Sequence, residues 1–506
     1  MKKCYYIAGL FVLVFLSFFL RLYWTNLTIM EGDMFRDFTI AEDILKGNLR
    51  YTGVGSLDQL HHQQSFGPLM YYFIAFILYL FKTPIAIAFF VGILNTIAVL
   101  ITFKFCKEYF NERIAFITSF LYAVNPWAVY ISSFHWNPNY LPFFSVIFFY
   151  FLFGFVLKNK DNYLIYCSFI LAIMLNFHLT ALFFIIILVL IIILFRRDVK
   201  FKFLFYSLFA FIIPFLPFLY YNIINKISIF GPIFYGVSSR EYSGVITGFV
   251  QSFGIPFMLA TNYLGKYVYG NSFIFLNNWI KYLLFSLTIL ISFLLICALF
   301  FAFNKIKNFN GIYSNKKISL LLILFFIFPI IHFLRFSDVS PHYFFIMYPV
   351  QFVLIAIFVS FLLEKINKFR NIIISLFVLI LLLQVFNIFL LFNYVAKNGP
   401  TELGEFSIPY KTKIDIINYI KKDANGKYIN IIFFRNDKGF KYLLEKNIPD
   451  ANYIYANFVS DLKNVKNSYL ILDRFSMHRI NLSDEEKKYF ENMNKTIIKK
   501  VEIYKI

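Results

Sequence analysis

Five acidic residues within residues 28–49 are the side chains of this sequence best suited to chemistry. The chain has 506 residues, of which only 27 are acidic. The five are Glu31, Asp33, Asp37, Glu42 and Asp43. A carboxylate in such a cluster can deprotonate or orient a hydroxyl that attacks a substrate. Asp33 and Asp37 are one helical turn apart and would share a face. We expect both to be catalytic, the alternative being helix capping or a solvated face, and we expect the other three to face solvent.

The chain that must position these acids has the composition of an integral membrane protein. Hydrophobic residues make up 60% of it, more than a soluble chain of this length could bury. Repeated apolar runs of about 18–22 residues match the thickness of a bilayer. The net charge of +21 is explained by cationic cytoplasmic loops. No nucleic-acid motif is present, so we expect the bilayer and not nucleic acid as a partner. The four cysteines lack CxxC spacing, which favours structural thiols.

The apolar runs predict an all-α polytopic membrane domain, residues 1–395, with about eleven transmembrane helices. The expected spans are residues 5–22, 85–103, 114–131, 140–157, 162–177, 179–195, 203–221, 279–303, 319–335, 342–363 and 371–392. If the N-terminus is cytoplasmic, every inner turn is rich in Lys and Arg, as the positive-inside rule requires. The first helix lacks a small-residue cleavage site and is expected to stay uncleaved. Residues 23–84, residues 222–278 and the C-terminal region then lie outside.

Residues 68–82 are apolar but too short for an ordinary span, and Pro84 follows them closely. If they crossed the membrane, every later basic turn would lie on the outside. We therefore expect an interfacial helix in the outer leaflet.

The composition changes at about residue 400, where charged residues return and apolar runs shorten. Residues 400–506 predict a small extracytoplasmic α/β domain. Its expected elements are an amphipathic helix at 414–422, buried strands at 428–434 and 469–472, a capped helix start at Ser483 and a closing strand at 496–506. The domain contains no Gly-rich phosphate loop and no catalytic triad, so we expect it to support the protein or recognise substrate.

Five short motifs occur in a recognisable order along the chain. They are Gly32-Asp33 followed by Asp37, Gly67-Pro68-Leu69-Met70-Tyr71-Tyr72, Asn125-Pro126, Trp136-Asn137-Pro138 and His342-Tyr343 with Pro349. This order resembles the GT-C class of polyprenyl-phosphate-dependent glycosyltransferases. Within that class it is similar to the bacterial branch of protein O-mannosyltransferases and the lipid A aminoarabinose transferase. The resemblance covers the whole membrane domain, and an outer C-terminal domain also fits that branch.

The resemblance implies an enzyme that transfers a sugar from a polyprenyl-phosphate donor to an extracytoplasmic glycolipid, glycan or protein. In that family an acidic residue of the first outer loop, commonly in an Asp-Glu pair, acts as the base or positions the acceptor. Here the motif is Gly-Asp, so Asp33 is the residue that matches. The donor already has a good leaving group, so a single displacement with inversion needs no nucleophilic side chain.

Outer cations could neutralise the departing phosphate, and Arg suits it through its bidentate fork. The candidates are Arg36, Arg240, Lys266, Arg335 and His342. An ion pair of Arg335 with Asp338 is an alternative for that turn. Arg21 and Lys82 are expected to snorkel to the interface.

Trp136 and Asn137 could border the acceptor cavity, or start a helix beside an interfacial Trp. His135 and His178 are expected to be satisfied interfacial residues. The adjacent His61 and His62 lack convergent ligand spacing, so neither a metal nor another cofactor is expected.

Two rival functions stay open. One is a polymerase or ligase that uses a diphosphate-linked glycan, and the other is a flippase or transporter of lipid-linked saccharide. Scarce ionisable residues within the spans and the lack of an internal repeat count against transport. A cavity that opens only outside, with Asp33 at its mouth, would favour transfer. The expected location is the plasma (inner) membrane, crossed many times, with a cytoplasmic N-terminus.

Overall fold

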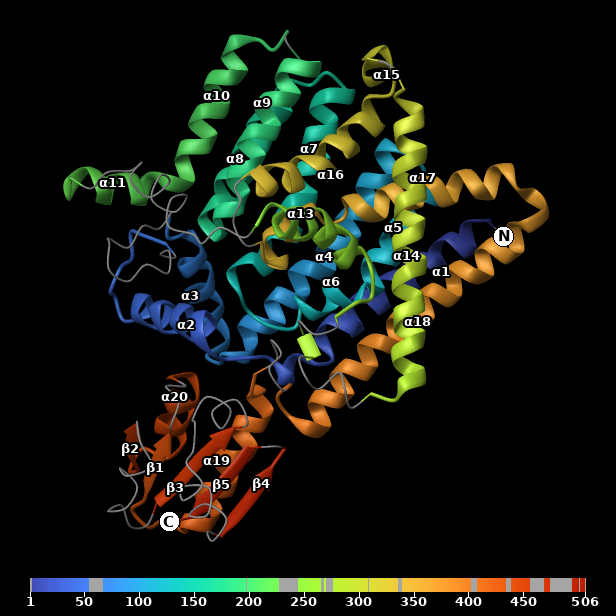
Figure 1. Ribbon diagram of the computed structural model, residues 1–506. Helices are drawn as coiled ribbons and strands as arrows, with labels where there is room; N and C mark the ends of the chain where they lie inside the picture. Colours follow the sequence, from blue (N-terminus) through green and yellow to red (C-terminus); the bar gives the residue numbers. More distant parts are fainter. Residues whose placement is uncertain are drawn as a thin grey trace.

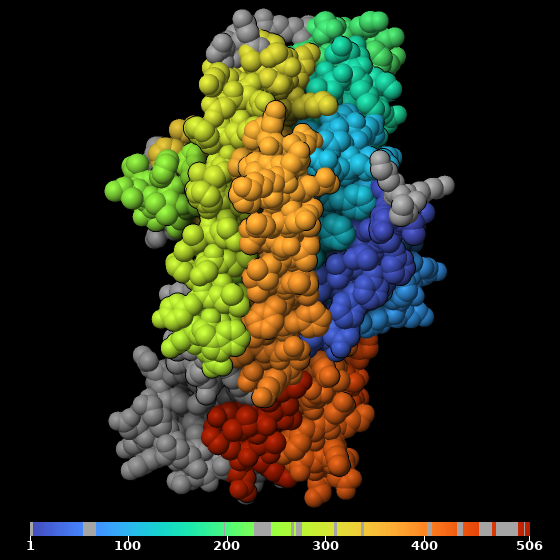
Figure 2. Space-filling model, turned by 90° about the vertical axis from the view of Figure 1, so that its right-hand side faces the viewer, coloured from blue at the N-terminus to red at the C-terminus, as the bar shows by residue number. Residues whose placement is uncertain are grey.

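A bundle of apolar helices and a small α/β domain at one end of it make up the fold (Figures 1 and 2). The structure is a computed structural model. It describes residues 2–53, 67–196, 198–226, 244–264, 268–269, 276–307, 309–334, 339–401, 407–433, 438–455, 468–473, 494–499 and 501–505.

Seven helices among the described residues are long and apolar enough to cross a membrane. They contain α1 (Lys2–Leu22), α4 (Ile85–Tyr109), α7 (Leu141–Leu157), α10 (Phe201–Ile212) with α11 (Leu216–Ile224), α14 (Asn278–Lys305), α16 (Lys316–Leu334) and α18 (Arg370–Asn398). An eighth is counted if η7 (Pro341–Met347) and α17 (Val350–Lys365), which are bent by 55°, form one span.

The other three expected spans are present as shorter helices. They are α5 (Glu112–Val124), α8 (Asn162–Phe177) and α9 (Phe183–Phe195), the last preceded by η3 (Leu179–Leu182). The 16 residues of α8 rise about 24 Å, less than the hydrocarbon core of a typical bilayer. The expected helix at 114–131 is divided because Asn125 adopts an extended conformation and caps the next helix, α6 (Pro126–Tyr130).

Two helices between α1 and α4 lie side by side, α2 (Gly32–Leu45) and α3 (Leu69–Phe81) (Figure 1). The 13 residues of α3 are too few to cross a bilayer alone. It ends at Lys82, an exposed residue in the left-handed region with φ of 53°. The acid cluster is therefore carried by α2, which packs against a short helix that does not span the membrane by itself.

Arg21 is buried, with 1% of its surface exposed, so the expectation that it snorkels to the interface is wrong. Its guanidinium donates to the carbonyl oxygens of Tyr122 and Ala123 at distances of 3.1 and 2.8 Å. It also lies over the Tyr122 ring. The last carbonyls of α5 have no partner within their helix and carry partial negative charge, so they attract this cation inward.

The C-terminal domain has a five-stranded sheet in the order β2-β1-β3-β5-β4. Its elements are α19 (Tyr410–Ala424), β1 (Asn430–Phe433), α20 (Lys438–Asn447), β2 (Asn452–Tyr455), β3 (Ser468–Asp473), β4 (Lys495–Ile498) and β5 (Val501–Lys505). Strand β1 pairs in parallel with β2 and β3, whereas β5 is antiparallel to β3 and β4.

Three expected elements of this domain, the amphipathic helix and the two buried strands, are present as α19, β1 and β3. The expected closing strand at 496–506 is a hairpin of β4 and β5, because Lys499 takes a left-handed turn with φ of 46°. The helix start at Ser483 lies outside the described residues. Neither α20 nor β2 was predicted from the sequence.

Candidate active site

Helix α2 begins within the acid cluster, between Glu31 and Asp33. Glu31 is extended and Gly32 has a φ of +52°, a conformation that glycine adopts without steric cost. The chain thereby turns into the helix one residue before Asp33, which lies in the first turn. A carboxylate there is stabilised by the positive end of the helix dipole.

Arg36 joins the two aspartates that the sequence singled out. Its Nη1 donates to Oδ1 of Asp33 at 2.7 Å, and its Nε and Nη2 donate to Oδ1 of Asp37 at 2.9 and 2.7 Å. Burial alone would lower the pKa of Arg36, but the charges of Asp37 and Asp33 raise it above its ordinary value. The Asp33 side chain is 43% exposed and that of Asp37 is fully buried, so only Asp33 presents a carboxylate to a substrate.

A second group of side chains surrounds the buried Asp37. Nε2 of His135 lies 3.3 Å from Oδ2 of Asp37, and Nδ1 of the same ring is 2.8 Å from the hydroxyl of Tyr140. The first contact has the distance of an ion pair but not the orientation of a hydrogen bond. Tyr71 of α3 is buried nearby, and burial, followed by the charge of Asp37, raises the pKa of its phenol. Asp37 is thus enclosed by Arg36, His135 and tyrosines.

The turn before α7 brings Trp136 to the exposed aspartate. The indole Nε1 donates to Oδ2 of Asp33 at 3.3 Å. The turn is held by Asn139, whose carbonyl accepts from the Asn95 side chain of α4 and whose amide donates to the carbonyl of Phe134. Asn137 is buried within η2 (Asn137–Tyr140). The motif therefore starts a helix and also contacts the acid cluster.

A row of neighbouring aromatic rings that includes three histidines begins at Trp136. The Trp136 and His342 rings are 4.6 Å apart between centroids, and His342 and His178 are 5.6 Å apart. His332 of α16 stacks on Tyr343 at 5.5 Å. The bend between η7 and α17 thus places His342 beside the turn that holds Trp136.

The structure brings together Asp33, Asp37, Arg36, Trp136 and His342, out of the residues that the sequence indicated. Arg240, Lys266, Arg335 and the His61-His62 pair lie outside the described residues. Arg36 is between two carboxylates, which changes its expected role: its charge is already compensated. Sequence reasoning did not assign Tyr71, Tyr140 or His332 to the site, and it treated His135 as interfacial. The position of His135 directly before Trp136 in the sequence could have indicated that His135 lies near the site.

The other three acids of residues 28–49 were expected to face solvent, but only one of them does. Glu31 lies 3.4 Å from the buried ammonium of Lys413, and Glu42 accepts a hydrogen bond of 2.7 Å from the Tyr442 hydroxyl. The expectation is wrong for these two because the C-terminal domain covers them. Asp43 is exposed and pairs with Lys46 three residues later, as expected.

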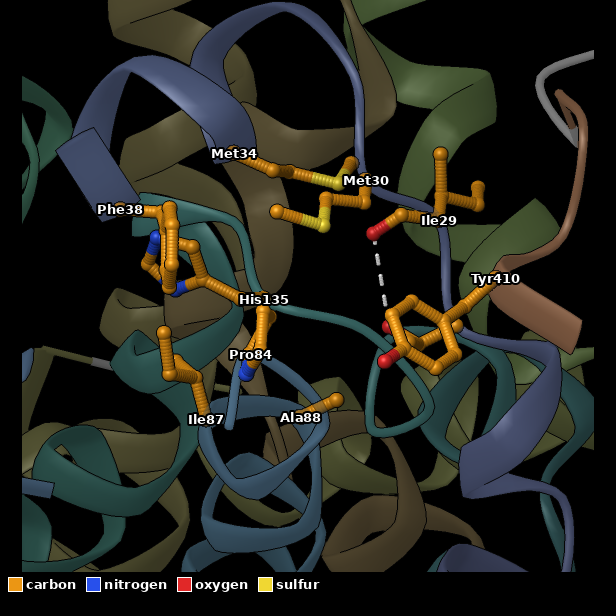
Figure 3. A pocket seen from close by; sticks show the side chains of 10 residues that line it. Ile29, Met30, Met34, Phe38, Pro84, Ile87, Ala88, His135 and Tyr410 are labelled. Carbon is orange, nitrogen blue, oxygen red and sulfur yellow. Dashed lines mark hydrogen bonds between the residues drawn. The ribbon is translucent and has the colours of Figure 1, made fainter. Parts of the chain in front are cut away.

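A small apolar pocket lies beside the acid cluster (Figure 3). His135 and Phe38 line it on one side and Tyr410 of the C-terminal domain lies across from them. Neither Asp33 nor Asp37 lines it, so it adjoins the cluster through His135 and is not the place where a reacting sugar would meet Asp33. In the part of the chain that the structure describes, no three His, Cys, Asp or Glu residues are grouped as metal ligands.

Comparisons with known proteins identify the fold. Residues 65–221 match the family described as dolichyl-phosphate-mannose-protein mannosyltransferase. The structure of ArnT from Cupriavidus metallidurans bound to undecaprenyl phosphate is 10% identical, with a TM-score of 0.55, over 99% of this chain and 97% of that one. The Archaeoglobus fulgidus oligosaccharyltransferase, in complex with Zn and sulfate, is 14% identical, with a TM-score of 0.53, over 92% of this chain and 68% of that one.

The same archaeal enzyme, AglB, in complex with an inhibitory peptide and a dolichol-phosphate, is also 14% identical and has a TM-score of 0.50, over 93% of this chain and 70% of that one. No curated protein matches the sequence significantly. Both solved relatives are GT-C glycosyltransferases. The chain therefore has the GT-C glycosyltransferase fold, as the resemblance in its motifs predicted.

Proposed function

We propose that this protein transfers a sugar from a polyprenyl-phosphate donor to the hydroxyl of an acceptor on the side of the membrane where α2 and the C-terminal domain lie. The observation that carries the proposal is the half-exposed carboxylate of Asp33, held by Arg36 and Trp136 on a helix at the edge of the apolar bundle. Its support comes from the mannosyltransferase family match and from solved relatives that hold undecaprenyl phosphate or dolichol-phosphate.

The reaction is a single displacement. The acceptor oxygen forms a bond to the anomeric carbon while the bond from that carbon to the phosphate oxygen breaks. The lipid phosphate leaves with the electron pair, and the acceptor proton passes to Asp33. Because the attack is on the face opposite the leaving group, the anomeric configuration is inverted.

The other side chains of the cluster have supporting roles in this proposal. Asp37 holds Arg36, and Arg36 in turn fixes Oδ1 of Asp33, while the indole of Trp136 fixes Oδ2. His342, against the Trp136 ring, is the described candidate for a partner of the departing phosphate. Arg240, Lys266 and Arg335 stay candidates for the same role, and Trp136 with Asn137 borders the acceptor. The proposal includes no cofactor.

The proposal is tested by lipid analysis of a deletion strain complemented with wild-type protein, Asp33→Asn or Asp43→Asn. The deletion is expected to accumulate one polyprenyl-monophosphate sugar, which names the donor. Wild type and Asp43→Asn should remove it, since Asp43 is exposed on the same helix and its side chain contacts only Lys46 among the contacts described. Asp33→Asn should express and fold but leave the lipid in place.

Retained transfer in Asp33→Asn would remove this residue from the mechanism. Accumulation of a diphosphate-linked glycan would instead favour the oligosaccharide polymerase or ligase. Unchanged lipids, with saccharide retained on the inner leaflet, would favour a flippase.

A further inference from the structure

Helix α2 has two faces that contact different parts of the molecule. At about 100° per residue, Asp33, Arg36 and Asp37 lie on one face of the helix. Phe35, Phe38 and Glu42 lie on the opposite face. The first face contacts the membrane domain through His135 and Trp136. The second contacts the C-terminal domain, which lies directly beside α2 in Figure 1.

Tyr442 of α20 contacts α2 along the face from Phe35 to Glu42. Its ring lies 5.7 Å from that of Phe35 and 5.1 Å from that of Phe38. Its hydroxyl donates to Glu42 at 2.7 Å. Burial, followed by this hydrogen bond and the charge of Glu42, raises the pKa of Tyr442, so the hydroxyl stays protonated as the donor.

Lys413 of α19 makes the contacts at the start of α2. Its ammonium is fully buried, donates to the carbonyl of Met30 at 3.0 Å and lies 3.4 Å from Glu31. The backbone N–H of Tyr410 donates to the carbonyl of Thr28 at 2.8 Å, next to a bridge between Ile29 and Pro409. The segment that leads into α2 is therefore attached to the C-terminal domain by backbone and side-chain contacts.

We infer that the C-terminal domain positions the catalytic helix, with Lys413 and Tyr442 as positioning residues that hold the start and one face of α2 and thereby the Asp33 carboxylate. The inference rests on the proposed function. A helix of 14 residues is marginal by itself in water, so its orientation depends on what it packs against. Small misplacements of a catalytic group lower rates strongly.

The test uses the full-length protein carrying Lys413→Met and Tyr442→Phe together. These changes remove one charge and one hydroxyl and retain most of the side-chain volume. The matched control is Tyr419→Phe, which also removes a tyrosine hydroxyl, but one that pairs with Thr496 inside the domain. A second pair compares Glu42→Gln, which keeps an acceptor oxygen for Tyr442, with Glu42→Met, which does not.

Two readouts are measured, amide hydrogen exchange of residues 32–45 and steady-state transfer. In the double variant we expect exchange in α2 to rise and kcat to fall about tenfold, with the donor KM changed less than about twofold. Tyr419→Phe and Glu42→Gln should resemble wild type in both readouts, and Glu42→Met should resemble the double variant.

Unchanged exchange in α2, or an equal loss of kcat in Tyr419→Phe, would overturn the positioning role. The exchange readout does not depend on activity. If wild-type protein transfers no sugar but α2 exchanges faster in the double variant, the proposed function fails and the attachment of α2 to the domain stands.

Discussion

Asp33 and Asp37 share the guanidinium of Arg36, but the Asp33 side chain is 43% exposed and that of Asp37 is fully buried. An exposed ion pair contributes little to stability, whereas removal of one partner of a buried pair leaves an uncompensated charge. The two residues therefore separate by role: Asp33 is available for chemistry, and Asp37 holds the groups around it.

This difference predicts opposite consequences for two alanine variants. Asp37→Ala removes the buried carboxylate that faces both Arg36 and His135, and we expect it to destabilise the protein by about 3 kcal/mol. Asp33→Ala should cost below about 1 kcal/mol but abolish transfer. Thermal unfolding of both variants in the same detergent measures which of them loses more stability. A larger loss of stability in Asp33→Ala would contradict the assignment of roles.

At the level of residues, the sequence singled out Asp33 and Asp37 but predicted neither the burial of Asp37 nor the groups that surround the two acids. Asp33, Arg36 and Asp37 could be placed together because they share one helix, and local spacing defines such contacts. His135 and Trp136 are about a hundred residues away in the chain, so their contacts with α2 depend on tertiary packing. The burial of Glu31 and Glu42 depends in the same way on a domain almost 400 residues further along.

At the level of elements, the junction between α5 and α6 shows how one residue can organise three helices. The amide of Asn125 donates to the carbonyls of Leu259, Ala260 and Thr261 at 3.1 to 3.3 Å. These carbonyls belong to the end of α13 (Val245–Ala260). The carbonyl oxygen of the same side chain accepts from the N–H of Ala128 and caps α6.

Asn125→Ala should therefore lower stability by about 2 kcal/mol, since it leaves buried carbonyls and the N–H of Ala128 without partners. Asn125→Asp should be at least as harmful, because it keeps the cap but directs a carboxylate at carbonyl oxygens. Unfolding temperatures of both variants, compared with Asn111→Ala, provide the measurement. Asn111 is a matched control because it caps α5 through Ile114 alone. A smaller effect at Asn125 than at Asn111 would contradict this account.

Helix positions could be predicted from the sequence because apolar runs that cross a bilayer have a required length. The points at which these helices are interrupted or bent were harder to predict. Asn125-Pro126 and Pro349 were visible as motifs, yet only packing determines that the first divides a span and that the helices on either side of the second are bent by 55°. In the C-terminal domain, strands β1 and β3 were predictable as short apolar runs, whereas β2 has a single aliphatic residue and was not predicted.

At the level of the whole molecule, the acid cluster and the C-terminal domain lie on the same side of the helical bundle. Contacts of α19 and α20 with the first outer region require this, because the domain could not reach α2 across a membrane (Figure 1). The choice between the two sides of the membrane follows from charge. The turns that lie opposite carry Lys104, Lys107, Arg113, Lys158, Lys160, Arg196 and Lys200. Basic turns favour the cytoplasmic side, so we propose that α2 and the domain are extracytoplasmic.

This orientation predicts the outcome of reporter fusions in a bacterial plasma membrane. A phosphatase that is active only outside the cytoplasm should be active when it is joined after Ile506 and inactive when it is inserted in the turn between α7 and α8. A reporter that matures only in the cytoplasm should give the reverse pattern at the same two sites. Because Lys413 and Tyr442 tie the domain to α2, an active phosphatase after Ile506 also places Asp33 outside, where a flipped lipid-phosphate sugar is presented. Cytoplasmic reporter activity after Ile506 would invert the topology, move Asp33 to the inner leaflet and require a donor and acceptor made in the cytoplasm.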